Sequence, residues 1–188
     1  AYPIIPVSDI KVPWFAEAKQ AFLKRKIDYT LGAGQHSGTH MCSGIIDIMR
    51  TGWVVPAWHD LVITTNGDGE SFSWNTPTNQ LANMLDGVEP IGDFGKEYFA
   101  DYVDLPSTTL KSVVKWHTPW RFNIPKGWGL IYLPLPYVNE TRFTSAIGIL
   151  DPALSNELHA ILFWHELNGQ TLIKAGTPLF QVIPVRLD

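Results

Sequence analysis

The stretch from Leu110 to Asp188 is a series of short apolar runs that glycine, proline and asparagine interrupt every few residues. The runs are rich in Val, Ile, Leu, Phe, Tyr and Trp, which favour extended backbone. This punctuation predicts several short strands joined by tight turns, and therefore a compact β-domain at about 110–188. This pattern constrains the fold more than any other feature of the chain, but it does not indicate a particular activity.

Composition and charge exclude several classes of protein. Hydrophobic residues make up 45% of the 188 residues, which indicates a folded globule with room for a core. The formal net charge is −4 and the longest basic run is Lys24–Lys26, so binding to nucleic acid has little support. No apolar run approaches the roughly 18 residues that span a membrane, and no signal-peptide pattern opens the chain. The single cysteine, Cys42, excludes an internal disulfide and a cysteine-based zinc site, so we expect a protein made in a cytoplasm.

Residues 1–109 predict an α+β extension before the β-domain. Pro3 and Pro6 exclude a helix at the start and favour an extended arm over residues 1–12. Residues 13–26 carry apolar side chains at spacings of three and four and end in a basic turn. This pattern predicts an amphipathic helix that begins at its proline.

The chain then alternates between short elements and turns. Ser43 is expected to cap a short helix that stops at Gly52. The residues 66–69, Asn-Gly-Asp-Gly, are a strong signal for a turn between two strands. Strands are expected at 53–56, 59–65 and 70–74. Residues 75–109 are the least regular part, and we interpret them as an insertion over the β-domain with a short helix at 80–85.

Three motifs in the β-domain follow one another in a recognisable order. Tyr132-Leu-Pro-Leu-Pro136 comes first, Gly148-Ile-Leu-Asp151 follows, and Lys174-Ala-Gly-Thr-Pro-Leu-Phe-Gln181 closes the domain. Their order and spacing resemble the dUTPase and dCTP deaminase group, whose fold is the β-clip. The segment from Thr118 to Gly127 also resembles uncharacterised proteins of tailed phages that infect marine bacteria. The resemblance covers roughly the last 75 residues, and it implies a β-clip-like small barrel or sandwich.

The residues that carry the family's chemistry are largely absent. The phosphate-binding Arg-Ser pair is replaced by Leu135 and Pro136, and the expected tyrosine is replaced by Leu154. Asp151 matches the acid that activates water in dUTPases, so it is the catalytic candidate if the chain is an enzyme. A site without phosphate donors and a base platform should not bind a triphosphate well. We therefore expect no catalysis and no cofactor, since a shared fold does not transfer an activity.

One predicted strand carries the candidate metal ligands. Over residues 157–165, alternation places Glu157, His159 and His165 on one face. Two histidines and a carboxylate could form part of an iron site, to which His117 could add a group. In an extended strand Glu157 and His165 are roughly 27 Å apart, so only Glu157 and His159 could share one metal.

Three classes of function remain open. The first is a phage virion structural protein of the capsid decoration or cement type, without catalysis. The second is a nucleotide-handling enzyme of the dUTPase type with altered motifs, and the third is a metal-dependent oxygenase on a double-stranded β-helix. The phage-like segment, the many Trp and Pro residues and the missing catalytic residues favour the first. This interpretation implies a location in the virion after synthesis in the host cytoplasm, and contact with the major capsid protein or another virion protein.

The expected assembly is a homotrimer. Proteins of the β-clip group commonly form trimers, and a capsid cement protein would sit on local threefold axes. The extended segment at residues 1–12 is apolar, so its burial on another subunit would stabilise the contact between subunits. The final strand, which contains Pro184, is expected at a sheet edge, where it could pair across chains. The residues expected in the interface are Tyr2, Ile4, Ile5, Val7, Phe180 and Val182.

Overall fold

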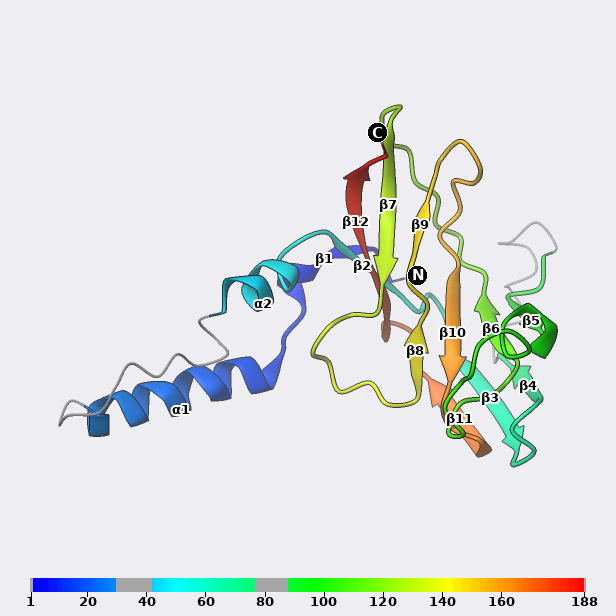
Figure 1. Cartoon of the computed structure of the whole chain (residues 1–188), viewed down its shortest axis with the longest axis horizontal. Helices are drawn as coiled ribbons and strands as arrows, with labels where there is room; N and C mark the ends of the chain where they lie inside the picture. Colours follow the sequence, from blue (N-terminus) through cyan, green and yellow to red (C-terminus); the bar gives the residue numbers. More distant parts are fainter. Residues whose placement is uncertain (1, 30–41, 77–87, 188) are drawn as a thin grey trace.

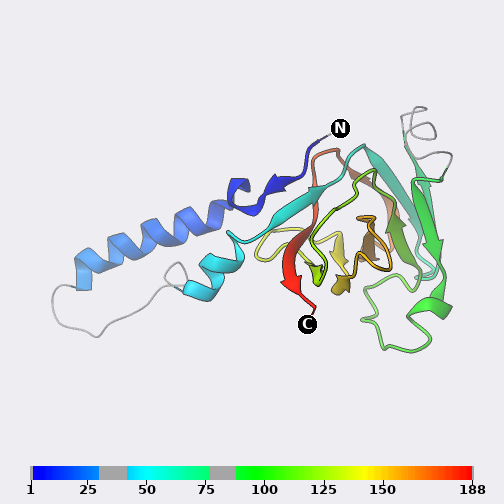
Figure 2. The ribbon, with the colours of Figure 1, turned by 90° about the horizontal axis from the view of Figure 1, so that it is seen from above.

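The computed structural model describes residues 2–29, 42–76 and 88–187. Within these residues the fold is mainly β, with strands β1 to β12 in three antiparallel sheets and few helices. Figures 1 and 2 show a β-body from which one long helix projects to the side. The prediction of a mainly β protein is therefore confirmed.

The N-terminal part forms a short extended segment and two helices. The segment holds β1 (Ile5–Pro6) and the 3-10 turn η1 (Val7–Asp9), and α1 (Pro13–Tyr29) begins at its proline, as predicted. α2 (Ser43–Ile48) has Cys42 at its N-cap position without a side-chain hydrogen bond, so the prediction that Ser43 caps this helix is wrong.

Gly52 joins the helical part to the β-body. Its φ is +78°, and an added Cβ would lie 2.0 Å from the carbonyl oxygen of Val182. Both the left-handed backbone and the close approach of a neighbouring strand therefore require glycine at this position.

The first sheet has five strands in the order β1-β2-β12-β7-β9. Besides β1, its strands are β2 (Trp53–Pro56), β7 (Trp128–Leu133), β9 (Gly148–Leu150) and β12 (Pro178–Arg186). β12 pairs with β2 over residues 178–182 and with β7 over residues 181–186, so it lies between them at 181 and 182, and the prediction that the final strand is an edge strand is wrong there. Among the described strands, residues 183–186 pair with β7 alone, and Pro184, which has no N–H, lies in this part.

The other two sheets have the orders β5-β6-β10-β8 and β11-β3-β4. Their strands are β3 (Leu61–Asn66), β4 (Phe72–Asn75), β5 (Ile91–Phe94), β6 (Val113–Trp116), β8 (Phe143–Ser145), β10 (Ala160–Trp164) and β11 (Asn168–Ile173). The predicted turn joins β3 to β4, with positive φ at Gly67 and Gly69. The 3-10 turn η3 (Lys96–Tyr98) lies in the irregular stretch, and the helix expected at 80–85 falls outside the described residues.

Strands from both ends of the chain share every sheet. β2 pairs with β12 in the first sheet, β5 pairs with β6 in the second, and β3 pairs with β11 in the third. Each of these pairs joins a strand from the part expected at 1–109 to one from the part expected at 110–188. The two parts therefore contribute to one apolar core.

The core follows from the period-2 alternation of the strands. In β3 and β10 every second side chain is buried, as an antiparallel sheet with one inward face requires. Among the eight tryptophans, Trp58, Trp116 and Trp164 are buried, whereas Trp53 and Trp128 are 44% and 38% exposed. Tryptophan thus contributes to both the core and the surface of the β-body.

Candidate functional site

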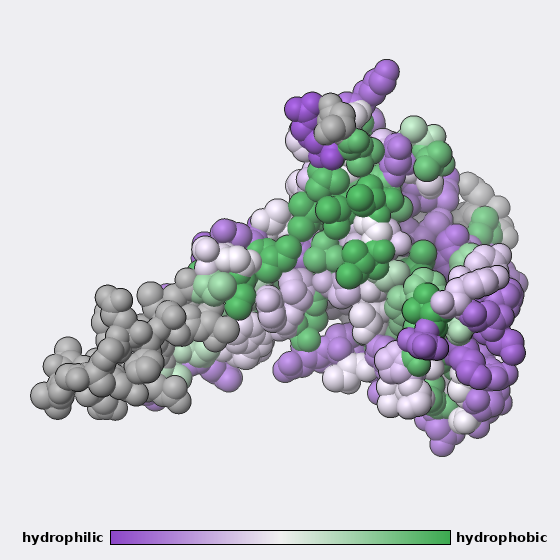
Figure 3. Space-filling model, viewed as in Figure 1, coloured by the Kyte–Doolittle hydropathy of each residue, from purple (hydrophilic) through white to green (hydrophobic). Residues whose placement is uncertain are grey.

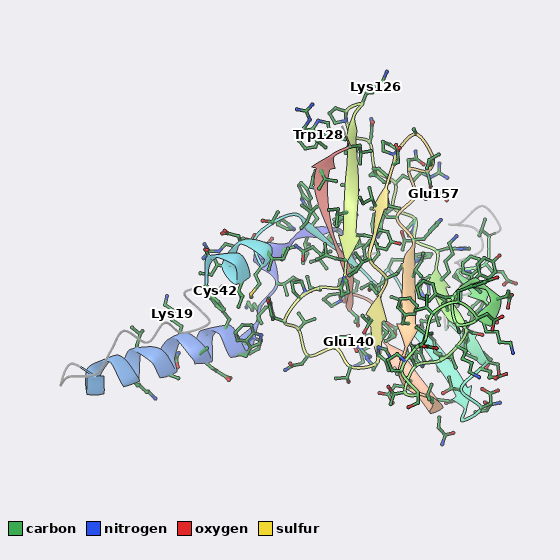
Figure 4. All side chains as sticks on the ribbon, in the orientation of Figure 1. Lys19, Cys42, Lys126, Trp128, Glu140 and Glu157 are labelled. Atoms are coloured by element: carbon green, nitrogen blue, oxygen red, sulfur yellow. The ribbon has the colours of Figure 1, made fainter. Side chains whose placement is uncertain are left out.

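The first candidate site is the helical arm, which consists of α1 and of α2 at its base. α1 leads away from the β-body in both ribbon views, and the side chain of Lys19 projects from it in Figure 4. At 1.5 Å per residue, its 17 residues extend about 26 Å. None of its described side chains is buried, and Leu23 is 51% exposed. A helix of this length is marginal in water without tertiary packing, so α1 presents surface that a partner could stabilise.

Specific contacts fix the base of the arm to the β-body. Trp14 Nε1 donates to the carbonyl oxygen of Tyr137 at 2.6 Å, and the two rings meet edge to face. Gln181 of β12 is fully buried, and its Nε2 donates to the carbonyl oxygens of Ile48 and Thr51 at 2.9 and 2.6 Å. The sheet thereby satisfies carbonyl groups at the C-terminal end of α2 that the helix leaves without intrahelical partners.

A small apolar cluster seats the segment that precedes α1. Val7, Val54 and Leu135 are buried in this cluster, and Ile5 and Ile10 pack against them. A shallow cleft of about 180 Å³ adjoins it, between η1 and the two helices. The N-terminal segment therefore packs on the β-body of its own chain.

The residues expected in an oligomer interface occupy different environments in the structure. These residues are Tyr2, Ile4, Ile5, Val7, Phe180 and Val182. Tyr2 is 54% exposed and the two isoleucines are half-buried, whereas the other three are at most 4% exposed. Because Phe180 and Val182 face the core of this chain, a contact with another copy depends on the exposed positions.

The second candidate site is a histidine cluster at the ends of β6 and β10. His117 and His159 face each other there, with ring centroids 4.8 Å apart. Glu157 Oε2 accepts a hydrogen bond from His159 Nε2 at 2.8 Å, and Arg121 lies 3.2 Å from the other carboxylate oxygen. His117 Nδ1 donates to the carbonyl oxygen of Glu89 at 2.8 Å. The structure thus brings Glu157 and His159 together, as predicted, and Figure 4 places Glu157 well away from the arm.

Burial favours the neutral form of the two histidines. It lowers the pKa of His117 and of His159, and this effect outweighs the opposing attraction of Glu157. Carboxylate and carbonyl oxygens only accept, so the ring hydrogens lie on His159 Nε2 and His117 Nδ1. His159 Nδ1 is left buried, with no hydrogen-bond partner among the described residues. A general base must reach the proton that it abstracts, and this nitrogen is closed to a substrate.

A metal ion would need several ligands close together. In the described parts of the chain, no three His, Cys, Asp or Glu side chains form a group that could hold an ion. Glu157 Oε2 and His159 Nε2 are hydrogen-bonded to each other, so these two atoms are not both free to bind a metal ion. His165, at the far end of the same strand face, contacts the hydroxyl groups of Thr109 and Thr144 instead.

Asp151, the catalytic candidate of the dUTPase interpretation, lies in the turn after β9. Its Oδ1 accepts the backbone N–H of Ala153 at 2.8 Å, and its carbonyl oxygen accepts that of Leu154 at 2.9 Å. Leu154 is 88% exposed. The carboxylate of Asp151 therefore stabilises the turn, which gives it a structural use.

Sequence reasoning missed a buried contact between His59 and Trp116. His59 is 6% exposed, its Nε2 accepts from Trp116 Nε1 at 3.0 Å, and its Nδ1 donates to the Asp60 carbonyl oxygen at 2.7 Å. In the sequence, Trp58, His59 and Asp60 lie where one expected strand ends and the next begins. Asp60 Oδ1 does accept the N–H of Ala175, but nothing in the sequence pairs His59 with a residue 57 positions away.

Comparison with protein-family models, with curated protein sequences and with solved structures gave no match. Among the described residues, no helix combines the length and the apolar character needed to cross a bilayer.

Proposed function

We propose that this chain is a structural protein of a phage virion, of the capsid decoration type, which acts by contact rather than by catalysis. The observation that carries the proposal is the arm, a helix about 26 Å long that buries none of its described side chains. Trp14 attaches the first turn of α1 to the β-body and Gln181 attaches the end of α2, so the base of the arm is in place before any partner arrives. Such preorganisation lowers the entropy cost of association. The phage-like segment at 118–127 is the link to a virion.

A β-clip relationship is part of the proposal. The ribbon of β2 and β12 in the first sheet continues into the ribbon of β3 and β11 in the third. β8 and β9, only two residues apart, likewise belong to different sheets. Ribbons that pass from sheet to sheet around one core support a small β-domain of this kind.

The proposal includes a homotrimer that contacts the major capsid protein or another virion protein. Light scattering on the full-length protein across a range of concentrations measures the mass directly. A mass three times that of one chain supports the trimer, and another stable multiple would replace it. A monomer at every concentration would contradict self-assembly in solution.

The location in the virion is tested on particles. Purified virions and particle-free lysate from the same infected culture would be compared by quantitative mass spectrometry. We expect a constant number of copies per particle after repeated gradient purification. Recovery from the lysate fraction alone would contradict the structural role.

The dUTPase interpretation has a direct test. The purified protein would be incubated with dUTP or dCTP and Mg²⁺, beside Asp151→Ala and the exposed control Asp104→Ala. We expect no hydrolysis by any of the three. Hydrolysis by the wild-type protein and by Asp104→Ala, but not by Asp151→Ala, would make the dUTPase-type enzyme the leading interpretation.

The oxygenase interpretation is tested by elemental analysis of protein purified without chelators. We expect no stoichiometric iron or zinc. About one metal ion per chain, lost in His159→Ala and retained in His165→Ala, would make the oxygenase the leading interpretation.

A further inference from the structure

The outer face of the first sheet is apolar where a solvated face would be polar. Residues directly opposite each other in an antiparallel pair share a face, so Ile183, Ile131 and Ile149 form one row across β12, β7 and β9. The alternate residues Val182 and Tyr132 pack in the main core on the other face. Antiparallel sheets with a solvated face alternate between apolar and polar residues, and this row breaks that pattern.

The isoleucine row is open to solvent in the single chain. Ile149 is 60% exposed, Ile131 and Ile183 are half-buried, and none of the three belongs to either apolar cluster. Figure 3 shows an apolar surface over β12, β7 and β9. Leu133 and Val185 continue the same face on β7 and β12, and Gln181, which lies opposite Leu133 and binds the end of α2, bounds the exposed part of this face.

The dimensions of this face match those of one helix. Three strands about 4.8 Å apart span about 10 Å, and a helix with its side chains is about 10–12 Å wide. The six residues of β7 extend about 20 Å, against about 26 Å for α1. A helix laid on the apolar face of a sheet is a standard layer arrangement in protein folds.

α1 has a free side that fits this position. Ala16, Gln20 and Leu23 are spaced by four and three residues, so they lie on one side of the helix, and all three are exposed. Trp14 holds the first turn of α1 on the β-body, and from there α1 leads away from the sheet of its own chain, as Figures 1 and 2 show. The outer part of the helix is therefore free to contact a second copy.

We propose that α1 of one copy covers the Ile183–Ile131–Ile149 row of a neighbouring copy, an inference that rests on the self-assembly proposed above. One helix face of about 26 Å by 10 Å covers on the order of 260 Å² in projection, below the roughly 800 Å² per partner of a standard interface. In a closed ring each copy gives one arm and receives one, which doubles the contact per copy to about 520 Å². Arm exchange around a ring, as in a trimer, is a head-to-tail contact that closes.

Charge substitution on the sheet tests the inference. Light scattering would compare the wild-type chain, Ile149→Lys and the control Leu172→Lys, which lies 42% exposed on β11 of the third sheet. We expect Ile149→Lys to weaken self-association at least tenfold and Leu172→Lys to leave it unchanged. An unchanged oligomer with Ile149→Lys would overturn the arm contact and leave self-assembly intact. A monomeric wild-type chain would overturn both.

A cysteine pair tests the contact itself. In a Cys42→Ser background, a chain with Gln20→Cys on α1 would be mixed under mild oxidation with a differently tagged chain carrying Ile149→Cys. We expect a disulfide between the two tagged chains, and a much lower yield when the second chain carries Tyr102→Cys, which is 78% exposed on another part of the body. Equal yields for Ile149→Cys and Tyr102→Cys would overturn the proposed placement.

Discussion

The arm and the β-body of this protein are stabilised in opposite ways. The body encloses Trp116, Trp164 and Phe180 completely, within one core to which all three sheets contribute. α1 buries none of its described side chains, and the contacts recorded for the arm are concentrated at its base. The body is therefore stable through its own packing, whereas the outer part of α1 depends on what lies against it.

A single strand serves both regions. Phe180 and Val182 of β12 face the core, while Gln181 between them faces the arm and donates to Ile48 and Thr51. Because successive side chains of a strand point to opposite faces, the register that places Phe180 and Val182 in the core also places Gln181 against the arm. The base of the arm, at the end of α2, is thus attached to the most central strand of the first sheet.

The largest expected effect is a difference in the free energy of unfolding when the same substitution, leucine to alanine, is made in the core and in the arm. Leu162 is fully buried and Leu23 is 51% exposed. Leu162→Ala should lower the free energy of unfolding by about 2–5 kcal/mol, because it leaves a cavity in a packed core. Leu23→Ala should change it by less than about 0.5 kcal/mol in the single chain. Urea unfolding below the concentration of self-association measures both, and similar losses would refute the division into two regions.

The next effect concerns the anchor of the arm. Gln181→Leu should lower the free energy of unfolding by about 1–3 kcal/mol, because it leaves two carbonyl groups of the α2 end without a donor. In this variant the hydrogen-exchange rate of the α2 amides should increase more than that of the β10 amides. The matched control is Gln170→Leu at an exposed position of β11, which should change little. Equal protection of α2 in both variants would show that Gln181 does not hold the helix.

The pH dependence of stability reports on the core histidine. Burial lowers the pKa of His59 below its ordinary value of 6.5, and its Nε2 must stay unprotonated to accept from Trp116. As the pH falls through 6.5, the unfolded chain takes up a proton that the folded chain refuses, so stability is full above this value and declines below it. One excluded proton contributes a slope of up to about 1.4 kcal/mol per pH unit.

Burial also lowers the pKa values of His117, His159 and His165, so these groups act in the same direction. Urea unfolding between pH 7.5 and 5.5 should therefore show a steep decline, and His59→Gln should reduce the slope while keeping an acceptor for Trp116. A slope that is identical in the variant would mean that His59 accepts its proton freely in the fold.

The smallest effect concerns the first turn of α1. Trp14→Phe removes the donor to the Tyr137 carbonyl oxygen and keeps an aromatic ring, so it should weaken the attachment of the arm by about 0.5–1.5 kcal/mol. Exchange of the α1 amides should increase while the unfolding of the β-body is nearly unchanged. Trp53→Phe, at a 44% exposed position of β2, is the control. Loss of body stability in Trp14→Phe alone would show that arm and body unfold together.

Local patterns in the sequence were sufficient for many of the elements. The proline at residue 13 and the spacing of three and four predicted α1, and Asn66-Gly-Asp-Gly69 predicted the turn between β3 and β4. The strand at Trp53–Pro56 was also predicted with its observed bounds. These features depend on neighbours a few residues apart, whose conformational preferences the sequence displays directly.

The candidate site was predictable only in fragments. Alternation along one strand put Glu157 beside His159, because a period of two is a local property. The apolar stripe of α1 indicated a packed helix, but periodicity shows which side of a helix is apolar and not whether another element lies against it. The projection of the arm therefore had no signal in the sequence.

Tertiary structure alone decided which distant residues meet. The central position of β12, the bond from Gln181 to Thr51 across 130 residues and the bond from Trp116 to His59 across 57 all depend on strand order and register. These are set by the packing of the whole core, since a shift of one residue would turn every side chain of a strand to its other face. The sequence by itself determined a mainly β chain with one long N-terminal helix, because those properties are local. Where that helix points, and which apolar residues of the first sheet stay exposed, followed only from how the strands assemble.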